Sequence, residues 1–240
     1  KEDPRIDGSD LPPAIINLTD TCGTFAFDYQ SIYSPSGLNP DYTGVMGLNN
    51  FDDSWGIWGH NLRKVLGDNV DKVYATIHGK TDDSQLCFSS EEMYRQIESY
   101  IVDNIGEKGS SRFVIAPDDT PYACTCASCT AMGNTEKNAT PAVTELLLRL
   151  SQRFPKHSFF TISYLSTKQV TDKQLPSNAG IIVSAIDFPL RRIDGKNAQE
   201  KKFMQQLNQW KKVSKNIYIW DYINNFDDYL TPFPILKIAQ

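Results

Sequence analysis

The sequence has no apolar run of 18 residues, so no segment is long enough to span a bilayer as a helix. It is also poor in clustered positive charge, with a formal net charge of −5. The lysine pairs at 201–202 and 211–212 lie on an expected helix, where they form a solvated face. Nucleic-acid and anionic-membrane partners are bound by clusters of Lys and Arg. We therefore expect neither kind of partner.

A secretory leader is missing as well, and the sequence begins at Lys1. We expect that a leader or an upstream domain has been removed. Residues 1–13 are polar, contain proline and are interpreted as a linker. A chain of 240 residues with 40% hydrophobic residues can bury the core of one large α/β domain. We assign that domain to residues 14–240 and expect it to be a fragment of a longer protein.

Cysteine is scarce, but three of the five cysteines, Cys124, Cys126 and Cys129, fall within six residues. The pattern C-x-C-x-x-C lacks the paired CxxC…CxxC spacing of common zinc sites. Three interpretations stay open. The three thiolates hold a structural zinc with a fourth ligand from Cys87, Cys22 or a histidine. Alternatively, a disulfide forms within the cluster or to Cys87 in a secreted protein, or free thiols pin the loop by packing. No other cofactor is expected.

From Val73 onwards, patterns typical of strands alternate with patterns typical of helices. Ser89 and Glu92 form a capping box for the first helix, and Thr140 caps the second, with Pro141 at its first position. The expected strands are 73–77, 112–116, 159–164, 181–185 and 217–220. The expected helices are 89–105, 140–154 and 198–213. Residues 19–56 are expected to be a long irregular segment.

Polar or aromatic residues follow each expected strand at its C-terminal end. They are His78, Asp118 and Asp119, Tyr164, Asp187 and Phe188, and residues 220–224. Alternating strands and helices imply parallel pairing, and ligand groups at the C-terminal end of every strand are typical of a (β/α) barrel. A doubly wound sheet would concentrate such groups at one switch point. We predict an α/β fold of the TIM-type (β/α) barrel. It is incomplete or cut short at the C-terminus, because five or six of the eight strands can be identified.

Asp118 and Asp119 stand directly after the expected strand 112–116 and Pro117. Neighbours on a regular strand point to opposite faces. The two carboxylates can therefore serve one site only if the chain bends, and Pro117 makes a bend plausible. The alternative interpretation is that the two aspartates cap a turn, where this residue type is common.

Trp55, Trp58 and His60 alternate with glycines just before a short helix. Glycine lets the backbone approach a ligand closely, and exposed tryptophan faces stack on sugar rings. The segment is therefore a candidate for binding carbohydrate. In the alternative interpretation, the two tryptophans fill the core and His60 caps the helix.

Four stretches together resemble the bacterial family of unknown function DUF4838. They are WGIWGHNL at 55–62, QLCFSSEEM at 85–93, the Asp118-Asp119 pair with its CTCASC block, and NIYIWDYINNFDDYLTPFP at 216–234. The resemblance covers roughly residues 55–240. Members look like glycoside-hydrolase barrels and occur in larger secreted proteins that handle polysaccharides. The family's barrel continues past the point that matches Gln240, which implies truncation.

More distantly, residues 113–119 and 220–224 resemble parts of the β-N-acetylglucosaminidases that use substrate assistance. That likeness implies that the acetamido oxygen of the sugar is the nucleophile, Asp119 the general acid/base and Asp118 the group that holds the acetamido N–H. Two adjacent carboxylates should also raise one pKa, which suits a proton donor. The cysteine loop departs from the pattern of those enzymes. The site can therefore accept an uronic acid or a neutral sugar, or do no chemistry.

The sequence thus predicts a secreted, periplasmic or cell-surface glycoside hydrolase that acts on polysaccharide or glycan-derived sugars. The alternative is a non-catalytic carbohydrate-binding barrel domain of a larger polysaccharide-processing protein. The predicted catalytic residues are Asp118 and Asp119. The predicted sugar-binding residues are Trp58, His60, Tyr164, Asp187, Trp220, Asp221 and Asn224.

Overall fold

The computed structural model describes residues 27–188 and 197–222. The chain divides into two compact units, residues 1–49 and residues 50–240. In the first unit the structure describes a 3-10 turn, Ser36–Leu38, and helix α1, Pro40–Met46. The side chain of Asn39 caps α1 by accepting a hydrogen bond from the backbone N–H of Asp41. The predicted linker 1–13 lies outside the described residues.

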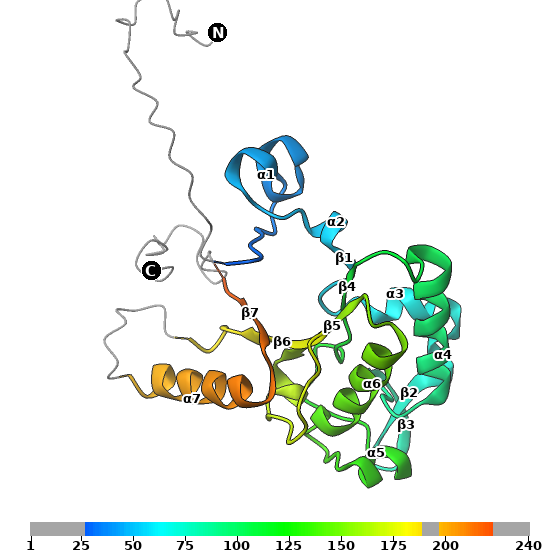
Figure 1. Cartoon of the computed structure of the whole chain (residues 1–240). Coiled ribbons are helices and arrows are strands. Elements are labelled where there is room, and N and C mark those ends of the chain that lie inside the picture. The colour runs from blue at the N-terminus through cyan, green and yellow to red at the C-terminus, as the bar shows by residue number, and fades with distance from the viewer. Residues whose placement is uncertain (1–26, 189–196, 223–240) are drawn as a thin grey trace, which may run out of the picture. The chain divides into compact units, whose positions relative to one another are not determined.

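The second unit is built on a sheet of five parallel strands (Figure 1). Their order in the sheet, β1-β4-β5-β6-β7, follows their order along the chain. The strands are β1 (Trp55–Ile57), β4 (Arg112–Val114), β5 (Ser158–Ser163), β6 (Ala179–Ser184) and β7 (Asn216–Trp220). Four of the five predicted strands therefore lie in the parallel sheet, with ends shifted by one or two residues. This confirms an α/β fold with parallel pairing.

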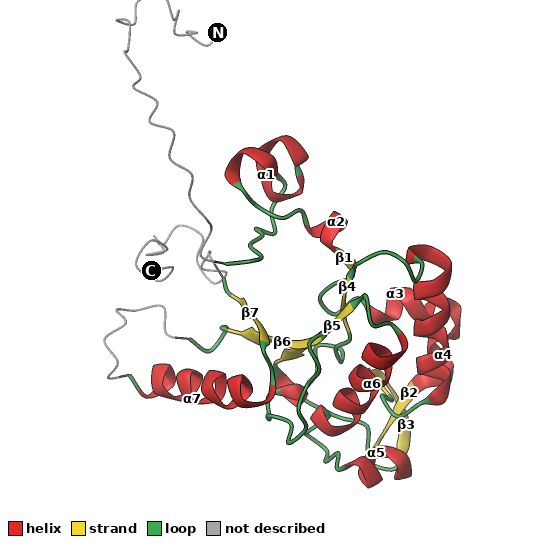
Figure 2. Cartoon of the chain, in the orientation of Figure 1, coloured by secondary structure: helices red, strands yellow, loops and turns green. Residues whose placement is uncertain are grey.

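Helices connect these strands (Figure 2). They are α2 (Phe51–Ser54), α3 (Leu62–Leu66), α4 (Glu91–Tyr100) with a π-helical turn (Ile101–Ile105), α5 (Ala127–Met132), α6 (Thr140–Arg153) and α7 (Ala198–Val213). Two short 3-10 segments, Gly67–Val73 and Leu165–Thr167, complete the set. The three long helices predicted from their apolar stripes are confirmed.

The predicted caps of two helices are corrected. Ser90, not Ser89, caps α4 by accepting from the N–H of Met93. Thr140 does not cap α6, because its hydroxyl donates to the carbonyl of Gln169 at 2.9 Å. In both cases a neighbouring part of the fold uses the hydroxyl that the local pattern assigned to the cap.

Helices α4 and α6 pack on the β1-β4-β5 side of the sheet, and α7 packs on β6. Phe113 of β4 and Phe159 of β5 are fully buried and stack with ring centroids 5.4 Å apart. They share one core with residues such as Met93 of α4 and Leu147 of α6. Further along the sheet, the alternate residues of β6 pack against Trp210 of α7. The same face of the sheet is therefore covered by all three long helices.

The opposite face of the sheet is concave. Trp55 of β1 and Tyr218 of β7 come from the two edge strands, yet their ring centroids lie 6.1 Å apart. Four strand spacings would separate the edges of a flat sheet by about 19 Å. Phe160 of the middle strand contacts both rings, at 5.5 Å and 4.9 Å, and Arg112 Nε donates to the Tyr218 hydroxyl at 3.2 Å. The sheet must curl strongly to bring these side chains together.

The strand predicted at 73–77 does form, but its place in the fold was predicted wrongly. Strand β2 (Tyr74–Ile77) pairs antiparallel with β3 (Lys80–Leu86) in a separate two-stranded sheet. The connecting residues, His78 and Gly79, both have positive φ, as a two-residue hairpin turn of type I′ requires. His78 therefore lies at an exposed hairpin tip beside Glu136 rather than at the end of a strand of the main sheet.

The segment 19–56, predicted to be irregular, contains α1, α2 and the first residues of β1 among its described part. Trp55 is only 7% exposed, which supports the interpretation that it fills the core. Within the described residues, no helix has the length and apolar character to cross a bilayer.

Candidate functional site

The curl of the sheet gathers the C-terminal ends of its strands. Gly59 follows β1 and Trp220 ends β7, at opposite edges of the sheet. A Cβ atom built on Gly59 would lie 3.6 Å from Cη2 of the Trp220 indole. Gly59 also has a positive φ of 60°, which glycine adopts without strain. The two edges therefore approach each other at the end of the sheet that carries the predicted site.

His60 ties the end of β1 to the end of β4. Its Nδ1 lies 2.6 Å from the carbonyl oxygen of Pro117. A carbonyl only accepts, so Nδ1 carries the proton and Nε2 holds the lone pair of the neutral ring. The ring also lies beside that of Tyr164, with centroids 6.0 Å apart. The alternative that His60 caps the next helix is not observed.

Asp118 is anchored on the side of the β2-β3 hairpin. Its Oδ2 accepts a hydrogen bond of 2.7 Å from Arg63 Nε in an ion pair. The buried side chain of Gln85 accepts from the Asp118 N–H at 3.0 Å and donates to the Asp118 carbonyl at 3.3 Å. Burial raises the pKa of Asp118, and the hydrogen bond and charge of Arg63 oppose that rise. The main cause is thus burial rather than the neighbouring carboxylate that the sequence suggested.

Asp119 is exposed, and its charge acts on two tyrosines that follow other strands. Burial, followed by the charge of Asp119 and a hydrogen bond to it, raises the pKa of Tyr164. Burial also raises the pKa of Tyr222, and the charge of Asp119 adds to that rise. Asp119 therefore lies among groups that follow β5 and β7, whereas Asp118 is held against α3 and β3.

Neither carboxylate closes the turn after Pro117. The Thr120 N–H donates to the Asp118 carbonyl at 2.7 Å, and the Thr120 hydroxyl accepts from the Tyr122 N–H at 3.4 Å. The turn is thus closed by backbone and a hydroxyl. The interpretation that the two aspartates serve only as turn caps does not match these contacts.

Backbone strain occurs at the same end of the sheet, where the strands have their C-termini. Leu165, directly after Tyr164, has a φ of 43°, a region that residues with a Cβ adopt at a cost. Nearby, Lys168 forms an ion pair with the exposed Asp187, whose charge also contributes to the raised pKa of Tyr164. A strained residue is held only where its surroundings determine its conformation, so the fold determines the backbone of Leu165, directly after Tyr164.

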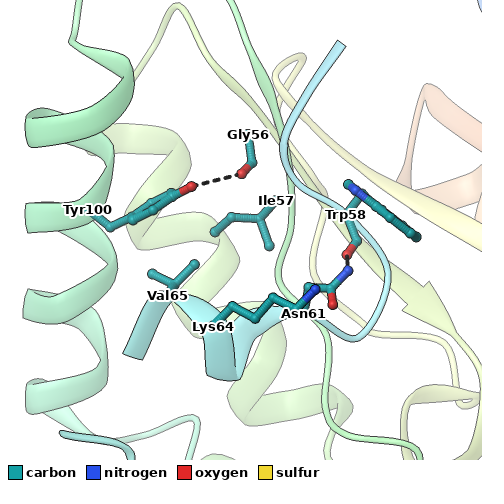
Figure 3. A pocket seen from close by; sticks show the side chains of 7 residues that line it. All are labelled: Gly56, Ile57, Trp58, Asn61, Lys64, Val65 and Tyr100. Atoms are coloured by element: carbon teal, nitrogen blue, oxygen red, sulfur yellow. Dashed lines mark hydrogen bonds between the residues drawn. The ribbon is translucent and has the colours of Figure 1, made fainter. Parts of the chain in front are cut away.

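Trp58 directly follows β1, two residues before His60. It lines a small hollow of about 150 Å³ between β1, α3 and α4 (Figure 3). The half-buried indole packs against Phe51, with centroids 5.5 Å apart. The Tyr100 hydroxyl closes another side of the hollow by donating to the carbonyl of Gly56 at 3.2 Å. This hollow is too small for a sugar chain, and it does not include the acid pair.

Four cysteines form a second cluster of side chains, and three of them follow the acid pair in the sequence. The Sγ atoms of four free cysteines lie within 4.8 Å of one another, and these four could hold a metal ion. They are Cys87, Cys124, Cys126 and Cys129. Hydrogen bonds with the neighbouring thiols lower the pKa of Cys124, while the same contacts raise that of Cys129. The structure shows no disulfide among the four.

The strand ends thus bring together most of the predicted site, but not all of it. His60, Asp119, Tyr164 and Trp220 share one end of the curled sheet, and Trp58, which directly follows β1, lines the small hollow beside α3 and α4. Asp221 is exposed at the same end as Trp220, and its Oδ1 accepts from the Tyr222 N–H at 2.8 Å. The predicted residue Asn224 lies outside the described residues.

Sequence reasoning missed Arg63 and Gln85, and it placed Tyr222 among the strand-end residues without giving it a role in the site. Arg63 lies 55 residues before its partner Asp118, and Gln85 lies 33 residues before it. No local pattern connects positions so far apart. A weak signal was available for the hairpin that carries Gln85, because His78-Gly79 is a turn-forming pair after a short strand.

These features define an α/β protein with a curled parallel sheet and polar side chains gathered at its C-terminal edge. Residues 61–240 match the model of a domain of unknown function, DUF4838. Because this match covers three quarters of the 240 residues, the chain belongs to the DUF4838 family. No curated protein and no solved structure matches the chain.

Proposed function

We propose that the protein is a glycoside hydrolase that acts on polysaccharide or glycan-derived sugars. The observation that carries this proposal is the position of Asp119, an exposed carboxylate among His60, Tyr164 and Tyr222 at the C-terminal edge of a parallel sheet. Glycosidic bonds are cleaved by carboxyl groups that donate and accept protons, and aromatic and hydroxyl groups beside them hold the sugar.

In this proposal Asp119 is the general acid/base, and Asp118 assists it. Arg63 holds the carboxylate of Asp118, and the oxygen and nitrogen of the Gln85 amide hold its backbone N–H and carbonyl. Asp118 is therefore suited to orienting a substrate from a fixed position. In the substrate-assisted scheme, Asp118 holds the acetamido N–H and the acetamido oxygen attacks the anomeric carbon. The proposed sugar contacts are Trp220, Asp187 and Asp221, which also lie at the C-terminal ends of strands.

We further propose that the sheet is part of a (β/α) barrel. Three features support this: strand order that follows the chain, long helices on one face only, and edge strands that approach across the concave face. A doubly wound sheet places helices on both faces and reverses its strand order. Polymeric glycans occur outside the cytoplasm, so we propose a secreted, periplasmic or cell-surface location.

The test is a panel of aryl glycosides, including an N-acetylglucosaminide, a glucuronide and a glucoside, together with release of reducing ends from polysaccharides. Asp119→Asn should lower turnover by about 10²–10⁴-fold, the usual contribution of a general acid/base. The thermal midpoint should stay unchanged because Asp119 is exposed. The matched control is Asp172→Asn, an exposed aspartate elsewhere.

Equal rates for Asp119→Asn and the native chain would exclude Asp119 as the acid. Saturable sugar binding without hydrolysis would support the alternative, a carbohydrate-binding domain. If the chain neither binds nor hydrolyses any sugar of the panel, both the hydrolase and the carbohydrate-binding proposals are overturned. A second readout is independent of turnover: Asp119→Asn should lower the pKa of Tyr164, because the Asp119 charge contributes to its rise.

A further inference from the structure

The four clustered cysteines come from separate segments of the chain. Cys87 follows β3, Cys124 and Cys126 belong to the loop after Asp119, and Cys129 lies in α5. Cys87 Sγ lies 3.7 Å from Cys126 Sγ and 3.8 Å from Cys129 Sγ, although 39 and 42 residues separate these pairs. The tertiary fold therefore brings Cys87 to the three sulfurs that the local segment 124–129 supplies.

The spacing of the sulfur atoms matches a tetrahedral metal centre. Zinc binds thiolate sulfur at about 2.3 Å, so the edge of a regular ZnS₄ tetrahedron is about 3.8 Å. Two of the six Sγ–Sγ separations, 3.7 and 3.8 Å, agree with that edge, and all six are within 4.8 Å. A disulfide needs about 2.05 Å.

We propose that Cys87, Cys124, Cys126 and Cys129 bind one zinc ion as four thiolates. A site with four protein ligands leaves no open position, which is typical of a structural centre rather than a catalytic one. The four thiols lose their protons when the ion binds, and those protons pass to solvent. This proposal is independent of the proposed hydrolase activity.

The groups around the sulfurs suit thiolates. The Thr76 N–H donates to Cys124 Sγ at 3.2 Å, and the Cys129 N–H donates to Cys126 Sγ at 3.5 Å. The Ser89 hydroxyl lies 3.1–3.5 Å from the sulfurs of Cys87, Cys126 and Cys129. A hydroxyl can rotate to donate, so it can stabilise a bound thiolate. Such outer partners orient ligands and tune metal affinity.

The zinc would join the β2-β3 hairpin to the loop that carries the acid pair. Cys87 is two residues beyond Gln85, whose amide holds both backbone groups of Asp118. On the other side, Thr125 donates to the Thr76 carbonyl of β2 through its N–H, at 2.7 Å. Between these points the loop has no strand or helix of its own. The role of the metal is therefore to hold this loop against the hairpin.

The first experiment measures the metal content of the 240-residue chain purified without chelator from zinc-supplemented medium. One zinc per chain is expected, and a mercurial thiol reagent should release it as the four cluster thiols react. Iron with sulfide would overturn the assignment. So would disulfides within the cluster, or free thiols at all four of its positions in a chain that takes up no added zinc. These outcomes are read on the native chain, so they do not depend on whether a variant folds.

The second experiment compares variants. Cys87→Ser and Cys129→Ser should each lose the bound zinc, whereas Cys22→Ser, which removes the fifth cysteine, should retain one zinc per chain. Ser89→Ala should keep the ion with an affinity about 10–100-fold lower. Zinc retained at full affinity in Cys87→Ser would contradict the four-thiolate site. Removal of zinc from the native chain should also lower its thermal midpoint, and an unchanged midpoint would contradict the structural role.

Discussion

The helix-covered face and the concave face of the sheet are filled by different kinds of residue. The first is mostly apolar, with Phe113 and Phe159 packed on α4 and α6, and its buried Ser163 accepts a hydrogen bond from Trp210 Nε1 of α7. The second combines the rings of Trp55 and Tyr218 with the guanidinium of Arg112. Close apolar packing therefore stabilises the helix-covered face. Specific polar and ring contacts stabilise the concave face and also shape the proposed site.

The largest expected effect is on the helix-covered face. Phe113→Ala should lower the free energy of unfolding by about 3–5 kcal/mol, since it leaves a cavity in a fully buried layer. Denaturant unfolding of the full chain measures the loss. Val102→Ala, which alters an exposed side chain on the same side, should change stability by less than about 0.5 kcal/mol. A loss below about 1 kcal/mol for Phe113→Ala would contradict close packing there.

An intermediate effect is expected when one hydroxyl is removed from each face. Tyr218→Phe keeps the ring stack on Phe160 but removes the acceptor for Arg112 Nε, so it should cost about 1.5–3 kcal/mol. Tyr100→Phe removes a hydrogen bond to the neutral Gly56 carbonyl and should cost about 1 kcal/mol. Denaturant unfolding of both variants tests the order. A larger loss of stability for Tyr100→Phe than for Tyr218→Phe would show that the bond between Arg112 and Tyr218 does not help to stabilise the curled sheet.

The smallest expected effect is the pH dependence contributed by Asp118. Its pKa is raised in the folded state, so the folded chain binds more protons in that range than the unfolded chain. The stability of the native chain relative to Asp118→Asn should therefore be highest at low pH. It should fall as the pH rises from the ordinary aspartate pKa through the raised one.

Arg63→Gln sharpens this test. Arg63 opposes the rise in the pKa of Asp118, so its removal should enlarge the pH-dependent loss and move its upper limit to higher pH. Unfolding curves at a series of pH values from about 3 to about 7 give the measurement. A stability difference that grows with pH would mean that the ion pair, rather than burial, controls Asp118.

Several parts of the fold could be predicted because their signals are local. The apolar stripe of α4 and the π-helical turn after it includes Met93, Ile97 and Ile101, all buried as their helical spacing predicts. The short strand β4 was visible as an apolar run ended by Pro117. In contrast, β3 was missed because its residues are mostly polar and exposed, so it shows no alternation.

The candidate site was predictable only in part, because many of its contacts join residues that are far apart in the sequence. Asp118 and Asp119 could be selected as neighbours after a strand, but their different surroundings depend on Arg63, on Gln85 and on tyrosines after two other strands. Cys87 was one of several open choices for the fourth thiol, because nothing near it in the sequence distinguishes it from Cys22. Pairings over such separations leave no periodic trace in a single sequence.

The sequence by itself determined where the long helices and most of the parallel strands form, because hydrophobic periodicity and turn residues act over a few positions. Only the tertiary structure decided that the sheet curls until Trp55 approaches Tyr218. It also decided that four cysteines meet and that the two aspartates face different partners. These outcomes depend on contacts between residues far apart in the chain, and their energies exist only when the elements pack together.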